Sequence, residues 1–198
     1  MSAIKLRNVA LSHFARYGYE GASLSKIAEE VGIKKPTIYS HYKSKEDLFL
    51  SVVKYVFHLE KRQIFLYFQK EDKSDLKSKL EGFFDWFEAE FNLSDTTKFL
   101  LRMSYFPPPA LRNEMFQLST AFIDGMERLL YKMMKQHQIQ GELNGINMKD
   151  AALAYLTLVD GVIVELLFAG TNRYKKRADV AFPIYWRGIH SINKEYLL

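Results

Sequence analysis

The sequence contains no cysteine, which excludes disulfide bonds, thiol catalysis and thiolate zinc sites. Glycine (10 residues) and proline (5 residues) are also sparse for a chain of 198 residues, and no sustained alternation of polar and apolar residues occurs. Because sandwiches and barrels need frequent turn residues and alternating strands, neither is expected and an all-α fold is predicted. The hydrophobic fraction of 48% and the charged fraction of 26% exclude a disordered or low-complexity chain.

Neither a secretory signal nor a membrane span is predicted. Residues 1–20 carry scattered charges and lack an apolar stretch followed by small residues. The one candidate span, residues 151–169, contains Asp160 and Glu165, and each would cost about 2.5–3.5 kcal/mol near the centre of a bilayer. We therefore expect this segment to be a helix buried in protein, in a cytoplasmic protein that has no membrane partner.

The net charge of +5 is concentrated at the N-terminal end of the chain. Residues 1–47 contribute +3 of it, and the 151 residues that follow contribute +2. A polyanion would therefore meet the N-terminal region first. A solvated basic surface without a nucleic-acid partner is the alternative interpretation of this charge.

Two helices are predicted before residue 33. The first carries apolar residues at helical spacing and ends at Gly18. The second begins after the N-cap Ser23 and ends at Gly32, because glycine favours the left-handed conformation that closes a helix. The stripe of the first helix consists of Leu6, Val9, Ala10, Phe14 and Tyr17.

A third helix and the start of a fourth follow directly. Residues 33–42 predict a short helix with Pro36 in its first turn and Ile38 as its apolar anchor. Ser44 and Asp47 form the pattern of a capping box, which opens a long helix that extends to about residue 70. Two short helices joined by a tight turn and braced by a longer one form a helix-turn-helix, whose second member reads the major groove of DNA.

The predicted reading helix carries the side chains that DNA binding needs. No acid occurs in residues 31–45, and Lys43, Lys45 and the amides of the fourth helix add positive potential beside it. These side chains supply cations, hydroxyls, an imidazole and aromatic rings, and they belong to Lys34, Lys35, Thr37, Tyr39, Ser40, His41 and Tyr42.

The spacing of these motifs over some forty residues resembles the N-terminal signature of TetR-family transcriptional regulators. The resemblance implies a homodimeric DNA-binding repressor with a helix-turn-helix domain at residues 1–47 and a ligand-sensing, dimerising domain at residues 48–198. It is carried by Ala10, Phe14, Gly18-Tyr19, Ile27-Ala28, Val31-Gly32, Pro36-Thr37-Ile38-Tyr39, His41-Tyr42 and Lys45-Glu46-Asp47-Leu48.

The resemblance also implies DNA contacts for individual residues. Lys34 is a further candidate because of its charge. Base or backbone contacts are implied for Lys35, Pro36, Thr37 and Tyr39, phosphate contacts for His41 and Lys45, and backbone contacts for Ser23 and Ser25. For His41, an exposed histidine without a partner is the alternative. The sequence departs from the family pattern at His13, where an apolar residue is usual, and at Tyr42, where phenylalanine is common.

Further helices are predicted at residues 76–91, 96–105, 110–138, 149–170 and 179–196. The last two are rich in apolar and aromatic residues, and the resemblance places a two-fold dimer contact in them. A monomer core is the alternative. The basic run 173–177 is expected to be a solvated loop, although it could also contact an acidic group.

The aromatic residues in the middle of the chain are candidates for an effector site. Aromatic stripes are usually core, but the resemblance implies an effector cavity there, so a bulky apolar or aromatic ligand is expected. The candidate ligand residues are Phe83, Trp86, Phe87 and Phe106. Four acids on apolar helices could meet a cationic group on that ligand or could be capped by neighbours: Asp85, Glu88, Asp160 and Glu165.

No catalytic residue, metal site or cofactor is predicted. The five histidines are far apart in the sequence, and nucleophile-elbow, phosphate-loop and dinucleotide motifs are all missing. The predicted function is a transcriptional regulator that an effector releases from a palindromic DNA operator, with activation or corepression left open. The alternative is a helical module that binds protein or lipid and uses its basic residues for solubility alone.

Overall fold

A computed structural model describes residues 3–70, 75–139, 143 and 146–190. All regular elements in these ranges are helices, which confirms the predicted all-α class. The chain divides into two compact units, one formed by Met1–Gln63 with Phe91–Thr120 and the other by Ile64–Glu90 with Ala121–Leu198. From the sequence, the DNA-binding domain was predicted to end at residue 47. The division into two compact units does not test that boundary, so it stays a prediction.

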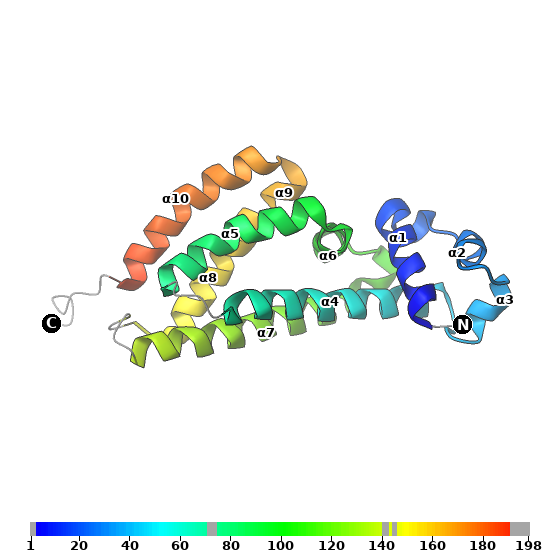
Figure 1. The fold of residues 1–198 in the computed structure, drawn as a ribbon, viewed down its shortest axis with the longest axis horizontal. Coiled ribbons are helices and arrows are strands. Elements are labelled where there is room, and N and C mark those ends of the chain that lie inside the picture. The colour runs from blue at the N-terminus through cyan, green and yellow to red at the C-terminus, as the bar shows by residue number, and fades with distance from the viewer. Residues whose placement is uncertain (1–2, 71–74, 140–142, 144–145, 191–198) are drawn as a thin grey trace. The chain divides into compact units, whose positions relative to one another are not determined.

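The first unit contains the N-terminal helices (Figure 1). Helix α1 packs against α2 and α6, and α2 packs against α3. Its core is apolar and includes the fully buried side chains of Leu6, Phe14, Ile27, Ile38 and Phe49. The helices are α1 (Ala3–Gly21), α2 (Leu24–Val31), α3 (Lys35–Tyr39), the first part of α4 (Lys45–Gln69), α6 (Asp95–Tyr105), the 3-10 helix η1 (Pro109–Leu111) and the start of α7 (Arg112–Ile139).

The predicted ends of α1, α2 and α4 are confirmed. Gly18 interrupts the helical geometry of α1 with φ +70°, and Gly32 closes α2 in the left-handed region with φ +83°. At the start of α4, the Asp47 amide donates to Ser44 Oγ over 3.1 Å, and the Asp47 carboxylate accepts from the Lys43 amide over 2.9 Å. The predicted Ser44 cap therefore forms, with the Asp47 carboxylate bonded to the Lys43 amide instead of the Ser44 amide of a full capping box, and it sets where α4 begins.

The third helix is shorter than predicted. Residues 33–42 were expected to form one helix, but α3 covers Lys35–Tyr39 alone. The amides of His41 and Tyr42 both donate to the Ile38 carbonyl, so the chain turns immediately after α3 to reach the cap of α4. Consequently the reading surface is a single helical turn with its flanking residues.

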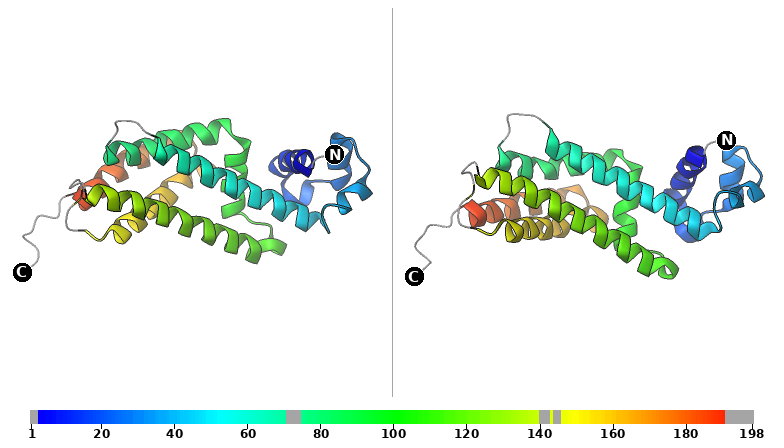
Figure 2. Two further views of the ribbon diagram at one scale, coloured as in Figure 1. Left: turned by 60° about the horizontal axis from the view of Figure 1, so that its bottom comes forward. Right: turned by 90° about the horizontal axis from the view of Figure 1, so that it is seen from below.

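The second unit is organised around α5 (Leu76–Leu93), most of which belongs to it. It also contains the end of α4, most of α7, α8 (Met148–Ile163), α9 (Glu165–Phe168) and α10 (Thr171–His190), and α8 and α10 pack side by side (Figure 2). Tyr67, Tyr155 and Tyr174 come from three different helices, and their hydroxyls all donate to backbone carbonyls of α5.

Two predicted helices differ from the structure. The segment predicted at residues 149–170 is divided at Val164 into α8 and α9. The last helix begins at Thr171 instead of residue 179, because Gly170 with φ +79° closes α9 and a new helix starts immediately. The prediction of a loop at residues 173–177 is therefore wrong, and residues 191–196 of the predicted last helix lie outside the described residues.

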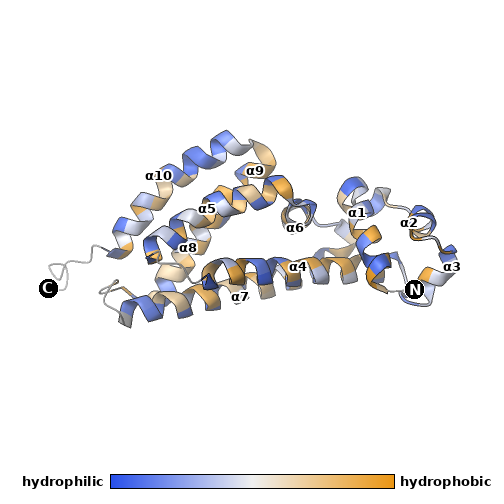
Figure 3. Ribbon diagram, in the orientation of Figure 1, coloured by the Kyte–Doolittle hydropathy of each residue, from blue (hydrophilic) through white to orange (hydrophobic). Residues whose placement is uncertain are grey.

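Within the described residues, one stretch is long and apolar enough to cross a membrane. It is Met148–Phe168, with a mean hydropathy of 1.9, and 44% of its most apolar window is buried inside the protein. Figure 3 shows the contrast between mostly apolar α8 and the hydrophilic first half of α10. Core helices also meet this criterion, so the stretch is only a weak indication of a membrane span.

Candidate nucleic-acid interface

Helix α3 offers its polar side chains to solvent because one apolar residue holds it in place. Ile38 is fully buried, whereas the side chains on either side of it are exposed, and Tyr39 is 49% exposed. Of the residues predicted to contact DNA, those exposed are Ser25, Lys34, Lys35, Pro36, Thr37, Tyr39 and His41. Six of these residues therefore lie on the accessible segment 34–41 between α2 and α4, and Ser25 lies on the first turn of α2.

Two predicted contact residues, Ser23 and Lys45, are only partly exposed. Ser23 stands at the N-cap of α2, but its side chain makes no capping hydrogen bond, so its hydroxyl is not committed to that helix. The Lys45 ammonium donates to the Glu20 carbonyl over 3.1 Å and lies 4.8 Å from the centre of the Tyr19 ring. The charge of Lys45 is thus held at the junction between α1 and α4.

The acid that precedes the basic segment is already partnered. The Glu30 carboxylate on α2 accepts a hydrogen bond of 2.8 Å from His13 Nε2 on α1. His13 is 8% exposed and lies beside Tyr17, as expected for a residue at the edge of this core. No acid follows Glu30 until Glu46, so the surface around α3 keeps its positive potential.

Known proteins share both the sequence signature and the fold. The family model described as bacterial regulatory proteins, tetR family, matches residues 6–52. The HTH-type transcriptional regulator YezE of Bacillus subtilis is 27% identical over 183 residues, which are 88% of this chain and 91% of YezE. The chain belongs to the TetR family. TetR-family members are DNA-binding transcriptional regulators, and this protein is one of them.

Two solved structures show how far the TetR fold extends along the chain. The structure of SmeT, the repressor of the Stenotrophomonas maltophilia multidrug efflux pump SmeDEF, has a TM-score of 0.71 at 14% identity and covers 98% of this chain and 92% of SmeT. That of Bacillus subtilis FadR in complex with stearoyl-CoA has a TM-score of 0.62 at 19% identity and covers 96% of this chain and all of FadR. At such identities the likeness shows the fold alone.

The predicted effector residues of this TetR-family protein are divided between its two units. Phe83 and Phe87 are buried in the second unit. The centre of the Trp86 ring lies 5.0 Å from the centre of the Tyr67 ring in the same aromatic cluster. Phe106, in contrast, belongs to the first unit and is 52% exposed. Three of the four residues therefore form one cluster, and their role in ligand binding stays a prediction.

The basic run of α10 neutralises acids that the sequence left without partners. Glu165 forms ion pairs with Arg173 over 2.8 Å and with Arg177 over 2.7 Å, and Glu88 pairs with Lys175 over 3.1 Å. Glu88 and Glu165 are 8% and 6% exposed. Their charges are balanced within the protein, which leaves no unpaired carboxylate at these two positions for a cationic ligand.

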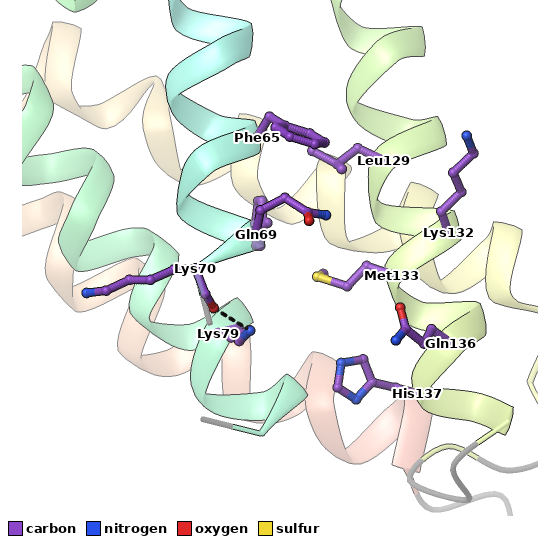
Figure 4. A pocket seen from close by; sticks show the side chains of 10 residues that line it. Phe65, Gln69, Lys70, Lys79, Leu129, Lys132, Met133, Gln136 and His137 are labelled. Atoms are coloured by element: carbon purple, nitrogen blue, oxygen red, sulfur yellow. Dashed lines mark hydrogen bonds between the residues drawn. The ribbon is translucent and has the colours of Figure 1, made fainter. Parts of the chain in front are cut away.

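A pocket that sequence analysis missed lies between the last turns of α4, the start of α5 and the second half of α7 (Figure 4). Its volume is about 620 Å³. It is lined by Phe65, Phe68, Gln69, Lys70, Lys79, Leu129, Lys132, Met133, Gln136 and His137. The lining residues from Leu129 to His137 recur at helical spacing in the sequence, but nothing in the sequence showed that α4 faces them.

Groups of three or more metal-ligating side chains do not occur in the described part of the chain.

Proposed function

We propose that this protein is a homodimeric repressor that binds a palindromic operator through α3 and is released by a small-molecule effector bound in the second unit. The exposed surface of α3, with its cations and hydroxyls and without acids, carries this proposal. Such a surface suits the phosphate backbone and the base edges of the major groove. Contacts to DNA are proposed for Ser23, Ser25, Lys34, Lys35, Pro36, Thr37, Tyr39, His41 and Lys45.

Dimerisation is proposed through α8 and α10. Large apolar side chains on α8, α9 and α10 remain exposed, with Leu153, Phe168, Val180 and Ile184 between 53% and 67% accessible. A shallow pocket between α8 and α10 is lined in part by Leu158, Gly161, Val162, Val180 and Ala181. Apolar residues around a close-packed centre are typical of interfaces between identical subunits.

The proposed switch acts through the spacing of the two reading helices. A dimer on DNA places them about 34 Å apart, which is one turn of the double helix. Helix α4 belongs to both units, so an effector that prefers another arrangement of α4 changes this spacing. The loss of operator affinity cannot exceed the difference between the effector's affinities for the two states.

Selection of genomic fragments by the purified protein tests the proposal. The expected result is one short palindrome, which is bound in a salt-dependent manner and far more tightly than random duplex. Placing that palindrome over a promoter should lower transcription when the protein is present. Salt-independent or absent DNA binding would overturn the proposal and favour the alternative, a helical module that binds protein or lipid.

A further inference from the structure

A cleft of the first unit lies between α1, α2 and α6, and all of its lining residues belong to that unit. Helices α1 and α6 pack against each other (Figure 1), and the volume of the cleft is about 570 Å³. Cavities of this size typically hold small organic ligands. The cleft shares no residue with the proposed DNA contacts. It is lined by Ser12, His13, Ala15, Arg16, Tyr17, Glu30, Asp95, Lys98, Phe99 and Arg102.

The two acids of this cleft already have partners within the protein. The Glu30 carboxylate accepts the 2.8 Å hydrogen bond from His13 Nε2. Asp95 forms an ion pair over 3.7 Å with Lys98, one turn later on α6, and the Asp95 side chain is 89% exposed to water. The Lys98 ammonium also donates to the Asn92 carbonyl over 3.1 Å. Consequently one of the three cations in the lining, Lys98, is engaged together with both acids.

The other two cations of the cleft are guanidinium groups from different helices. Arg16 on α1 and Arg102 on α6 are both exposed, and no ion pair in the described part of the chain involves either of them. A guanidinium presents its donors as a planar fork that matches two oxygens of a carboxylate or phosphate. The cleft therefore offers two such forks, and a ligand group with two negative charges can balance both.

Tyr17 adds an aromatic face beside these cations. It is 50% exposed, and the Arg16 guanidinium lies 5.9 Å from the centre of its ring. The buried His13 ring packs against Tyr17, with 5.7 Å between the two ring centres. Aromatic rings and guanidinium planes both stack on the ring of an aromatic ligand. A ligand ring can thus lie against Tyr17 while its charged group meets the arginines.

We propose that this cleft binds a small aromatic molecule that carries a doubly negative charge, as a phosphate monoester or a dicarboxylate. The charged group lies between Arg16 and Arg102, and the ring lies against Tyr17. Such a ligand would join α1 of the DNA-binding segment to α6. The inference goes beyond the proposed function, which places its effector in the second unit and needs no ligand in this cleft.

Calorimetric titration of the full chain at about pH 8, where phosphate monoesters carry two charges, tests the ligand class. The probes are phenyl phosphate, isophthalate, methyl phosphate, benzyl alcohol and benzyltrimethylammonium. The tighter of the two aromatic dianions should bind about tenfold or more tightly than benzyl alcohol, because charged hydrogen bonds are stronger than neutral ones. Its identity distinguishes a phosphate from a dicarboxylate. Equal affinity for the alcohol, or a preference for the cation, would overturn the proposal.

The phosphate probes with and without a ring test the aromatic part of the site. Phenyl phosphate should bind more tightly than methyl phosphate because its ring stacks and buries apolar surface. In Tyr17→Ser this advantage should shrink. If methyl phosphate binds the unmodified protein as tightly as phenyl phosphate does, the aromatic ligand class is wrong.

Arginine variants locate the charged part of the site. Arg16→Gln and Arg102→Gln should each weaken phenyl phosphate about tenfold or more. Both residues are exposed, so both variants should fold, and their melting temperatures check this. Arg112→Gln is the matched control, because Arg112 is an exposed arginine of the same unit that lies outside the cleft. Equal weakening by Arg102→Gln and Arg112→Gln would show that the site is wrong.

Duplex binding measured on the same preparations keeps this inference separate from the proposed function. Lys35→Glu should weaken duplex but not phenyl phosphate, and Arg102→Gln should do the reverse. A protein that binds its palindrome but neither aromatic dianion leaves the proposed function standing and overturns the cleft assignment. One that binds phenyl phosphate through Arg16 and Arg102 but binds no duplex confirms the cleft and overturns the regulator. Displacement of phenyl phosphate by random duplex would make the cleft part of the DNA-binding surface, which also overturns the inference.

Discussion

The hydroxyl of Tyr174 donates a 2.7 Å hydrogen bond to the backbone carbonyl of Phe84, 90 residues earlier in the chain. Tyr155 does the same to the Leu80 carbonyl over 2.6 Å, and Tyr67 to the Lys79 carbonyl over 2.9 Å. Each of the helices α10, α8 and α4 therefore donates one tyrosine hydrogen bond to the backbone of α5. The bonds of Tyr174 and Tyr155 are buried and that of Tyr67 is partly buried, and together they favour one arrangement of the four helices over slipped ones.

Tyr174→Phe should destabilise the second unit without changing DNA binding. The variant removes one buried hydrogen bond and leaves the Phe84 carbonyl with its helical partner, so the free energy of unfolding should fall by about 1 kcal/mol. For a chain of this size the melting temperature should fall by about 2–4 °C. Tyr131→Phe on α7 is the control, since none of the described hydrogen bonds involves the Tyr131 hydroxyl. Equal melting of the two variants would contradict the prediction.

Stability should decrease at high pH because of the same tyrosines. Burial raises the pKa of Tyr155, Tyr174 and Tyr185 above the ordinary value of 10.0, so at high pH the unfolded chain loses these protons first. Their stabilisation is complete below pH 10 and is lost as the pH rises, by up to about 1.4 kcal/mol per pH unit for each tyrosine. Denaturant unfolding between pH 8 and 11 measures this loss. Tyr174→Phe should show a shallower dependence than the unmodified protein, and identical slopes would refute the assignment.

Lys35→Glu should weaken binding to operator and random duplex together. Lys35 is exposed at the start of α3 and is proposed to contact DNA, so reversing its charge removes a counterion-releasing contact and adds repulsion. We expect the slope of log affinity against log salt to fall by at least about one. Electrophoretic mobility shifts at several salt concentrations measure it, with Lys135→Glu as a control of equal charge. An unchanged slope would exclude α3 as the docking element.

Val180→Asp should dissociate the dimer. Val180 on α10 is 59% exposed in a single chain, and a buried carboxylate at an apolar interface would be strongly unfavourable. Sedimentation equilibrium should show a dimer dissociation constant raised about tenfold or more, and palindrome affinity should fall with it. Phe116→Asp changes a residue on α7 that is 71% exposed and lies outside α8–α10. If that variant dissociates the dimer and Val180→Asp does not, the interface is elsewhere.

The ends of the N-terminal helices were largely predictable because their signals are local. Gly18, Gly32 and the pair Ser44 and Asp47 each mark a helix end through their own backbone or side-chain chemistry. The length of α3 was overestimated because the tight turn after Ile38 depends on how α4 starts. The placement of Phe83, Trp86 and Phe87 in one cluster could be expected from helical spacing, but Phe106 fell in the other unit.

By itself, the sequence determined the all-α class, the TetR signature and the exposed basic character of the segment around α3, since helix caps and periodicity act within a few residues. Only the tertiary structure decided that Glu88 and Glu165 pair with the basic run of α10, and that α4, α5 and α7 line one pocket. The partners in both cases are far apart in the chain, and such pairings depend on which helix faces pack together. A charge removed from water must be balanced nearby, so the buried carboxylates of Glu88 and Glu165 need the cations that this packing brings to them.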